Sequence, residues 1–148
     1  MNSFFPDVNV WLALADVRHS HYQPAWNWLN AVSLDDQLIL ARFCQLGILR
    51  LLTNPAVMSG AVMNIGQAWN AVARLMGDSR VEFRPEPVDL DPHFRRAMAP
   101  LAEKPASKWI GDCYVIASAH AHRATLVTFD RALLSFAETH GYAALRPN

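Results

Sequence analysis

The stretch WIGDCYVIASAHAHRATLVTFDRALLSFAETH, residues 109–140, decides the fold of this chain. Trp109 to His122 carries apolar residues at helical spacing, and Thr125 to Phe129 is rich in the β-branched and aromatic residues that favour strands. Arg131 to His140 predicts a second helix, which Gly141 ends. A short apolar strand between two helices is typical of a parallel sheet that is covered on both faces.

The remaining segments continue this alternation of strands and helices. Further strands are expected at Ser3 to Phe5, Gln37 to Leu40, Val81 to Phe83 and Ala144 to Arg146, and further helices at Val8 to Ala15, Tyr22 to Val32, Phe43 to Leu52, Ile65 to Met76 and Pro92 to Ala102. Surface loops are expected at Arg84 to Pro92 and Pro100 to Ser107. These features predict an α/β fold in one domain, residues 1–148, with a parallel sheet flanked by helices on both faces.

The composition excludes several classes of protein. The chain is 52% hydrophobic and 18% charged, which is too apolar for a disordered protein, and no apolar run is long enough to span a bilayer. The N-terminus lacks the basic segment of a secretory signal. Cys44 and Cys113 are too few for a disulfide framework, so we expect reduced, buried thiols in a cytoplasmic protein that does not associate with membranes.

The charges are balanced. Lys and Arg number 13 and Asp and Glu number 13, so the formal net charge is zero. Proteins that hold nucleic acid by their overall charge are normally basic. If this chain binds RNA or DNA, a local site must therefore provide the affinity.

Three aspartates are placed where a site can form. Asp7 directly follows the first expected strand, and Asp130 directly follows the strand at Thr125 to Phe129. In open parallel sheets, ligands bind beyond the carboxyl ends of the strands. Asp112 lies near the start of the helix that leads into the second of these strands. If the two strands are neighbours, all three carboxylates can meet at one edge of the sheet.

When carboxylates cluster at neutral pH, their repulsion raises the pKa of one of them, or the cluster binds a cation. Oxygen ligands without Cys or His favour Mg²⁺ or Mn²⁺ over zinc, and such an ion promotes hydrolysis of a phosphate ester. The alternative interpretation is that Asp7 and Asp130 only cap the helices that follow them. Asp112 is harder to explain in that way, because a charge inside an apolar helix is costly without a partner.

Three motifs resemble a known family in this order along nearly the whole chain. They are PDVNVWLALA at residues 6–15, CQLGILRLLTNPAV at 44–57 and IGDCYVIASAHAHRATLVTFDRAL at 110–133. Together they resemble PIN domains, and most of all the VapC-type ribonuclease toxins of toxin–antitoxin pairs. The resemblance implies a PIN-like three-layer fold and an endoribonuclease that uses Mg²⁺ or Mn²⁺ to hydrolyse phosphodiester bonds of single-stranded RNA.

The resemblance also implies roles for single residues. It assigns Asp7, Asp112 and Asp130 as the metal-binding carboxylates. Asn9 and Thr128 match polar positions that flank the site, where a hydrogen bond would orient a carboxylate or a water molecule.

One position departs from the family pattern. Gln45 stands where many PIN domains have Glu, which removes one negative charge, although its carbonyl can still accept a hydrogen bond from a metal-bound water.

Arg131, next to Asp130, is our candidate for contact with a substrate phosphate. Attack by water, with departure of the 3′ oxygen, would leave a 5′ phosphate and a 3′ hydroxyl.

Partners follow from the same resemblance. VapC-type toxins imply a cognate small, DNA-binding antitoxin of the VapB kind. The expected helix at Ile65 to Met76 has more apolar surface than one buried face needs, and a homodimer or the antitoxin would use it.

Three alternative functions remain open at this stage. A small phosphohydrolase of the haloacid dehalogenase type would use Asp7 as its nucleophile, but its general acid would fall on Asn9. A receiver-like signalling domain would need an acidic pair after the first strand and a lysine after a late one. The third alternative is a PIN-like binding module in which Gln45 weakens or abolishes catalysis.

Overall fold

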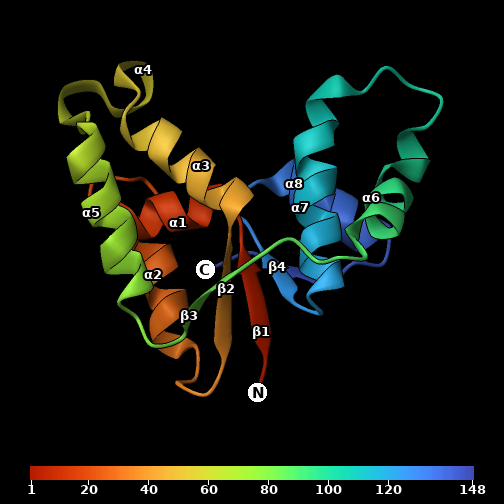
Figure 1. The fold of residues 1–148 in the computed structure, drawn as a ribbon, viewed down its shortest axis with the longest axis horizontal. Coiled ribbons are helices and arrows are strands. Elements are labelled where there is room, and N and C mark those ends of the chain that lie inside the picture. The colour runs from red at the N-terminus through yellow and green to blue at the C-terminus, as the bar shows by residue number, and fades with distance from the viewer.

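Five parallel strands form the centre of the computed structural model, which describes residues 1–148 (Figure 1). They are β1 (Ser3–Pro6), β2 (Gln37–Ala41), β3 (Val81–Arg84), β4 (Thr125–Val127) and β5 (Ala144–Leu145). Their order in the sheet is β3-β2-β1-β4-β5, and every neighbouring pair is parallel. The predicted α/β fold with a parallel sheet is confirmed.

Helices make all the connections between the strands. The α-helices are α1 (Val8–Ala15), α2 (Tyr22–Ala31), α3 (Arg42–Leu52), α4 (Pro55–Met58), α5 (Ile65–Met76), α6 (Leu90–Met98), α7 (Ile110–Ala121) and α8 (Arg131–Thr139). Short 3₁₀ helices lie at Ser59–Ala61, Ala99–Leu101 and Ser107–Trp109.

The strand order determines which face each helix covers. From β1 through β2 to β3 the chain moves in one direction across the sheet, and from β3 through β4 to β5 it moves in the other. Because such crossovers are right-handed, the helices of the two halves must cover opposite faces. Figure 1 shows α1, α2, α3 and α5 on one side and α6, α7 and α8 on the other. The predicted helix layers on both faces are therefore confirmed.

The direction of winding changes between β1 and β4, which pair directly. This is a topological switch point, where ligands bind in open α/β sheets. Asp7 follows β1 immediately, and Asp130 lies three residues after the end of β4. The fold therefore brings these two aspartates to the same edge of the sheet.

The core is built around the three central strands. Phe5 of β1, Leu38 to Leu40 of β2, and Leu126 and Val127 of β4 are almost completely buried. In α1, the five consecutive residues Val10 to Leu14 are also buried. The helix that Asp7 precedes is thus held firmly against the sheet and its neighbouring helices.

Some element boundaries differ from the sequence predictions. The helix α6 begins at Leu90, inside the predicted loop, because Pro92 lies in its first turn, where a proline is tolerated. The short helix α4 was not predicted. The strand predicted to reach Phe129 ends at Val127, since the polar groups beyond it bond to side chains of the site described below.

The apolar excess of α5 lies on its exposed surface. Its buried residues are Ala68, Ala71 and Val72, whereas Ile65 is 65% exposed and Trp69 47% exposed. Trp69 is therefore not part of the core, and this apolar face is available to a partner.

The cysteines agree with the sequence prediction, since Cys44 and Cys113 are both buried free thiols. None of the helices has the length and apolar character that crossing a membrane requires.

Candidate active site

Asp7 links the end of β1 to the start of α1. Its backbone N–H donates to the carbonyl oxygen of Val127 at 2.8 Å, which continues the pairing of β1 with β4. One carboxylate oxygen, Oδ1, accepts from the N–H of Val8 at 2.8 Å and so caps α1. The carboxylate is held in a fixed orientation at the switch point.

Asp130 has the corresponding position at the start of α8. Its Oδ1 accepts from the N–H groups of Ala132 at 2.9 Å and Leu133 at 3.1 Å. Both aspartates are thus helix caps and, at the same time, neighbours at the edge of the sheet. Capping of the two helices therefore does not exclude a second role of the same carboxylates in a site.

Thr128 and Asn9 connect the two loops through a closed set of hydrogen bonds. The hydroxyl of Thr128 donates to Asp7 Oδ2 at 3.1 Å and accepts from Asn9 Nδ2 and from the N–H of Asp130, each at 3.1 Å. Asn9 Nδ2 also donates to Asp7 Oδ2 at 3.2 Å, and Asn9 Oδ1 accepts from the N–H of Phe129 at 3.1 Å. These two side chains therefore fix the position of Asp7 relative to Asp130.

Asp112 lies in the first turn of α7, and the charges of both other carboxylates influence its pKa. Burial is the main factor that raises the pKa of Asp112, to about 6, and the charges of Asp7 and Asp130 add to it. The pKa of Asp7 is also raised, chiefly by burial and to a smaller degree by Asp130, against the hydrogen bonds from Val8 and Thr128. The three carboxylates thus share one electrostatic environment.

No cationic side chain compensates this concentration of negative charge. The five ion pairs of the protein involve other acids, namely Asp16, Asp78, Glu82, Asp89 and Asp91. Carboxylates that repel one another without a counter-ion favour binding of a cation. Because the donors are all oxygen atoms, the chemistry of the set fits Mg²⁺ or Mn²⁺ rather than zinc.

The carboxylates do not form a complete metal cage by themselves. No group of three or more His, Cys, Asp or Glu side chains is arranged to hold a metal ion in the structure. Mg²⁺ usually keeps several of its waters and takes only one or two protein carboxylates together with substrate phosphate. The donor set is therefore compatible with such an ion, and it is too sparse for one held by protein atoms alone.

Gln45 lies in the first turn of α3 and is buried. Its carbonyl oxygen accepts a hydrogen bond from the guanidinium of Arg42, which itself lies over the ring of Phe83, 4.7 Å from its centroid. The residue that replaces the usual glutamate thus has a protein partner. Arg42 had no place in the sequence prediction, although its spacing of three from Gln45 on a helix could have indicated the contact.

The first turn of α3 packs against the end of β1. Cys44 Sγ lies 3.8 Å from the carbonyl oxygen of Pro6, the residue before Asp7. Burial and the charge of Asp7 raise the pKa of the Cys44 thiol, so this cysteine stays protonated and is not a nucleophile. Arg131, at the start of α8, is exposed and forms no ion pair.

Sequence reasoning missed an aromatic residue beside the acids. Phe43 is 39% exposed, and its ring centroid lies 4.9 Å from that of Tyr114, two residues after Asp112. Its place two residues after the end of β2, at the carboxyl edge of the sheet, was the available signal.

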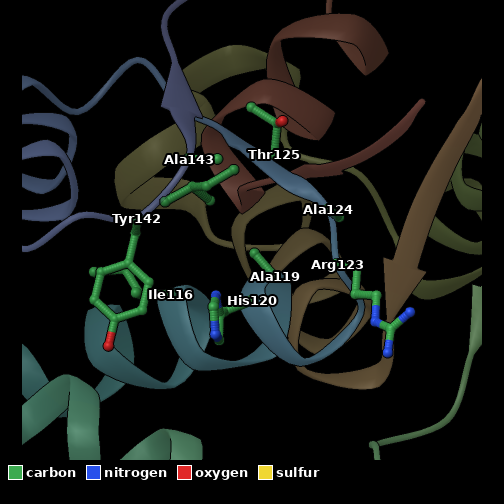
Figure 2. Close-up of a pocket in the computed structure, with 9 residues that line it drawn as sticks. Ile116, Ala119, His120, Arg123, Ala124, Thr125, Tyr142 and Ala143 are labelled. Carbon is green, nitrogen blue, oxygen red and sulfur yellow. The ribbon is translucent and has the colours of Figure 1, made fainter.

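A pocket of about 300 Å³ lies away from these residues, at the other end of β4 (Figure 2). It is lined by the start of β4 at Thr125, by His120 and Arg123 at the end of α7, and by Tyr142. None of its lining residues is acidic. It is separate from the aspartate site.

Comparison with known proteins identifies the family. The family model of the PIN domain matches residues 4–139. The chain belongs to the PIN domain family. This finding confirms the resemblance seen in the sequence motifs, and it removes the haloacid dehalogenase and receiver alternatives, which belong to other families.

This PIN domain is also similar to individual proteins. It is 33% identical over 134 residues to Ribonuclease VapC41 of Mycobacterium tuberculosis, a match that covers 88% of this chain and 90% of the relative. In fold it is similar to VapBC2 from Rickettsia felis bound to a promoter DNA fragment, with a TM-score of 0.72, 14% identity and 99% of each chain covered. VapBC-1 from nontypeable Haemophilus influenzae gives a TM-score of 0.68, 14% identity and 97% coverage of each chain.

Proposed function

We propose that this PIN domain is a divalent-metal-dependent endoribonuclease that acts in the cytoplasm as the toxin of a toxin–antitoxin pair. The observation that carries the proposal is the meeting of Asp7 and Asp130 at the switch point, with Asp112 in the same uncompensated negative field. The identity of one third to a ribonuclease over most of both chains supports the same activity.

Asp7, Asp112 and Asp130 would hold the ion, which we propose to be Mg²⁺. When bound, Mg²⁺ neutralises charge on a phosphate group and makes a water molecule more acidic. Asn9 and Thr128 keep the carboxylate of Asp7 in place, and Arg131 is free to bind a phosphate of the RNA. The raised pKa keeps the nearby thiol of Cys44 protonated and unsuited to attack. Our proposal is that water attacks the phosphorus and that the 3′ oxygen leaves, which would give a 5′ phosphate and a 3′ hydroxyl.

The decisive test is cleavage of labelled single-stranded RNA by the wild type and by Asp7→Asn. Asparagine keeps an oxygen that can cap α1 but removes the charge, so we expect cleavage to fall by roughly 10² or more while the fold persists. Asp91→Asn is the matched control, since Asp91 is exposed on α6 and pairs only with Arg95. Equal cleavage by wild type and Asp7→Asn would refute the proposal.

The same assay tests the ion and the products. Chelation by EDTA should abolish cleavage, and separate additions of Mg²⁺ and Mn²⁺ should show which ion restores it. The new 5′ ends should accept a label from a kinase only after phosphatase treatment. Full activity in EDTA, or 5′ hydroxyl ends, would contradict a metal-assisted attack by water.

The second candidate is a PIN-like binding module with weak or no catalysis, which is favoured by Gln45 in place of glutamate. Gln45→Glu restores the acid that the family pattern has at this position, in the turn of α3 that packs against the end of β1, and should lower the Mg²⁺ concentration needed for half-maximal cleavage. If the wild type cuts no RNA and Gln45→Glu does, the binding-module interpretation is correct. If the two proteins need the same Mg²⁺ concentration, residue 45 has no part in metal binding.

For partners, we propose a small DNA-binding antitoxin and a second copy of this chain. The exposed face of α5 with Ile65 and Trp69 supports an association of this kind. Growth arrest on induction of the wild type, relieved by co-expression of the product of the adjacent small reading frame, would establish the antitoxin. Arrest that no adjacent gene relieves would refute it.

A further inference from the structure

The partly exposed ring of Phe43 belongs to the same edge of the sheet as the acids, and the reaction described above gives it no role. Phe43 is the second residue of α3, which begins directly after β2, so its backbone is at the same edge of the sheet as Asp7 and Asp130. The side chain is apolar and aromatic but 39% exposed. A large apolar group exposed at a substrate site is a candidate for contact with the substrate.

One contact of the ring, and one contact of the next residue in the chain, indicate where Phe43 lies. Its Cζ atom is 3.5 Å from the position that a Cβ atom would take at Gly111, the residue before Asp112. The neighbouring Cys44 lies against the carbonyl oxygen of Pro6, the residue before Asp7. The ring of Phe43 therefore contacts the helix that carries Asp112, and the next residue along α3 contacts the segment that carries Asp7.

The surroundings of Phe43 are apolar and open. Leu46, three residues further on α3, is 43% exposed, and Ile110 at the start of α7 is 51% exposed. Gly111 has no side chain that could cover the ring. Figure 1 shows α3 and α7 on either side of the carboxyl edge of the sheet, the edge at which Asp7 and Asp130 follow their strands.

The charge balance of the chain makes such a surface useful to a nuclease. With a net charge of zero, the protein gains little affinity from general attraction to the phosphate backbone. Stacking of a base on an aromatic ring provides affinity that does not depend on charge, and an unpaired base presents a free face for it.

We propose that Phe43 is the platform on which one unpaired base next to the scissile phosphate stacks. The inference rests on the proposed nuclease function and goes beyond it, because it assigns a substrate-binding role to a residue outside the carboxylates. It explains how a neutral protein holds single-stranded RNA in register with its acids. The alternative is that the ring only packs α3 against α7.

The test compares Phe43→Leu and Phe43→Trp on an RNA oligonucleotide that the wild type cuts. Leucine keeps apolar packing but has no ring face, so we expect KM to rise about tenfold with little change in kcat. Tryptophan restores the ring and should bring KM back to the wild-type value or below it. Leu34→Ala is the control, because Leu34 is 79% exposed in the loop before β2, at the opposite end of that strand.

A second arm uses RNA in which one nucleotide near the cleavage site lacks its base. When the missing base is the one that stacks on Phe43, the KM of the wild type should rise about tenfold. The KM of Phe43→Leu should not change. An equal effect on both proteins at every position would overturn the proposal. The proposal would also be overturned if Phe43→Leu lowered kcat and the melting temperature together. Such a result would show that the ring only packs α3 against α7.

Failure of the nuclease function itself has a different signature. In that case the wild type cuts none of the RNAs, and both proposals fall together. Cleavage by the wild type without coupling between Phe43 and any base would overturn the stacking platform alone.

Discussion

The hydroxyl of Thr128 forms three hydrogen bonds, one as donor and two as acceptor, which is all that a hydroxyl can make. It lies at the point where the loops after β1 and β4 meet. A single buried side chain thus couples Asp7 to the backbone of Asp130. The precision of the acidic site depends on this residue, although Thr128 carries no charge.

Thr128→Val tests this coupling. Valine has nearly the same shape but leaves the N–H of Asp130 and one donor of Asn9 without an acceptor, so we expect a loss of about 1–3 kcal/mol in the free energy of unfolding. RNA cleavage should fall at the same time, since Asp7 loses a donor. Urea denaturation and the cleavage assay measure the two effects, and a variant with unchanged stability would refute the coupling.

The charge of Asp112 is expected to destabilise the metal-free protein at neutral pH. Its pKa is about 6 in the folded protein against 3.8 for the free side chain. Between these values the folded state binds more protons than the unfolded state, so stability falls as the pH rises through this window and stays low above it.

Asp112→Asn should therefore stabilise the metal-free protein at pH 7.5, by about 1 kcal/mol after allowance for the partial exposure of Asp112. The gain should become small near pH 3.5, below the free-side-chain pKa of 3.8, because Asp112 is then mostly protonated in both states. Urea denaturation in EDTA at the two pH values measures this difference. A gain of the same size at both would show that charge is not its cause.

The helix pair α1 and α3 shows how an element positions the site. Gly47 of α3 comes so close to α1 that an added Cβ atom would lie 2.8 Å from Cγ2 of Val8, the residue that follows Asp7. Only glycine permits this approach without a shift of one helix. The distance between these helices is thus set by one missing side chain.

Gly47→Ala should push Val8 and the start of α1 away from α3. We expect a loss of about 1–3 kcal/mol in stability, since overpacking a rigid contact costs this much, together with reduced RNA cleavage. Gly60→Ala is the matched control, because nothing lies within 4 Å of a Cβ at that position. Equal melting temperatures for the two variants would contradict this account.

Local sequence signals predict some elements better than others. The bounds of α1 and α5 agree with the sequence prediction because each follows a side-chain cap, Asp7 and Asn64. The prolines around residue 90 concealed the start of α6. The pairing of β1 with β4, which brings Asp7 and Asp130 to one edge, could be inferred from the sequence. The hydrogen bonds among Asn9, Thr128 and Phe129 could not, because they join residues about 120 positions apart and no local sequence pattern indicates them.

At the scale of the whole molecule, binding of a cation should stabilise the fold. The ion binds the folded state, in which the acids meet, and the unfolded chain has no such site, so the free energy of unfolding rises with ion concentration. At an Mg²⁺ concentration of 100 times Kd the gain is about 2.7 kcal/mol. Thermal denaturation with increasing MgCl₂ measures it.

The control for this titration is Asp7→Asn, for which the rise in melting temperature should be much smaller. NaCl at matched ionic strength accounts for general screening by salt. If the melting temperatures of the wild type and of Asp7→Asn rise equally with MgCl₂, the ion binds elsewhere on the protein.

The contact between Asp7 and Thr128 joins residues 121 positions apart, so the first and last acids of the site are far apart along the polypeptide. During synthesis on a ribosome, the emerging chain exposes Asp7 early and remains without a complete site until β4 has been made. Any product of interrupted translation that stops before that strand would be harmless to the cell's own RNA. The strand order thereby delays the activity of each new molecule until β4 has been made.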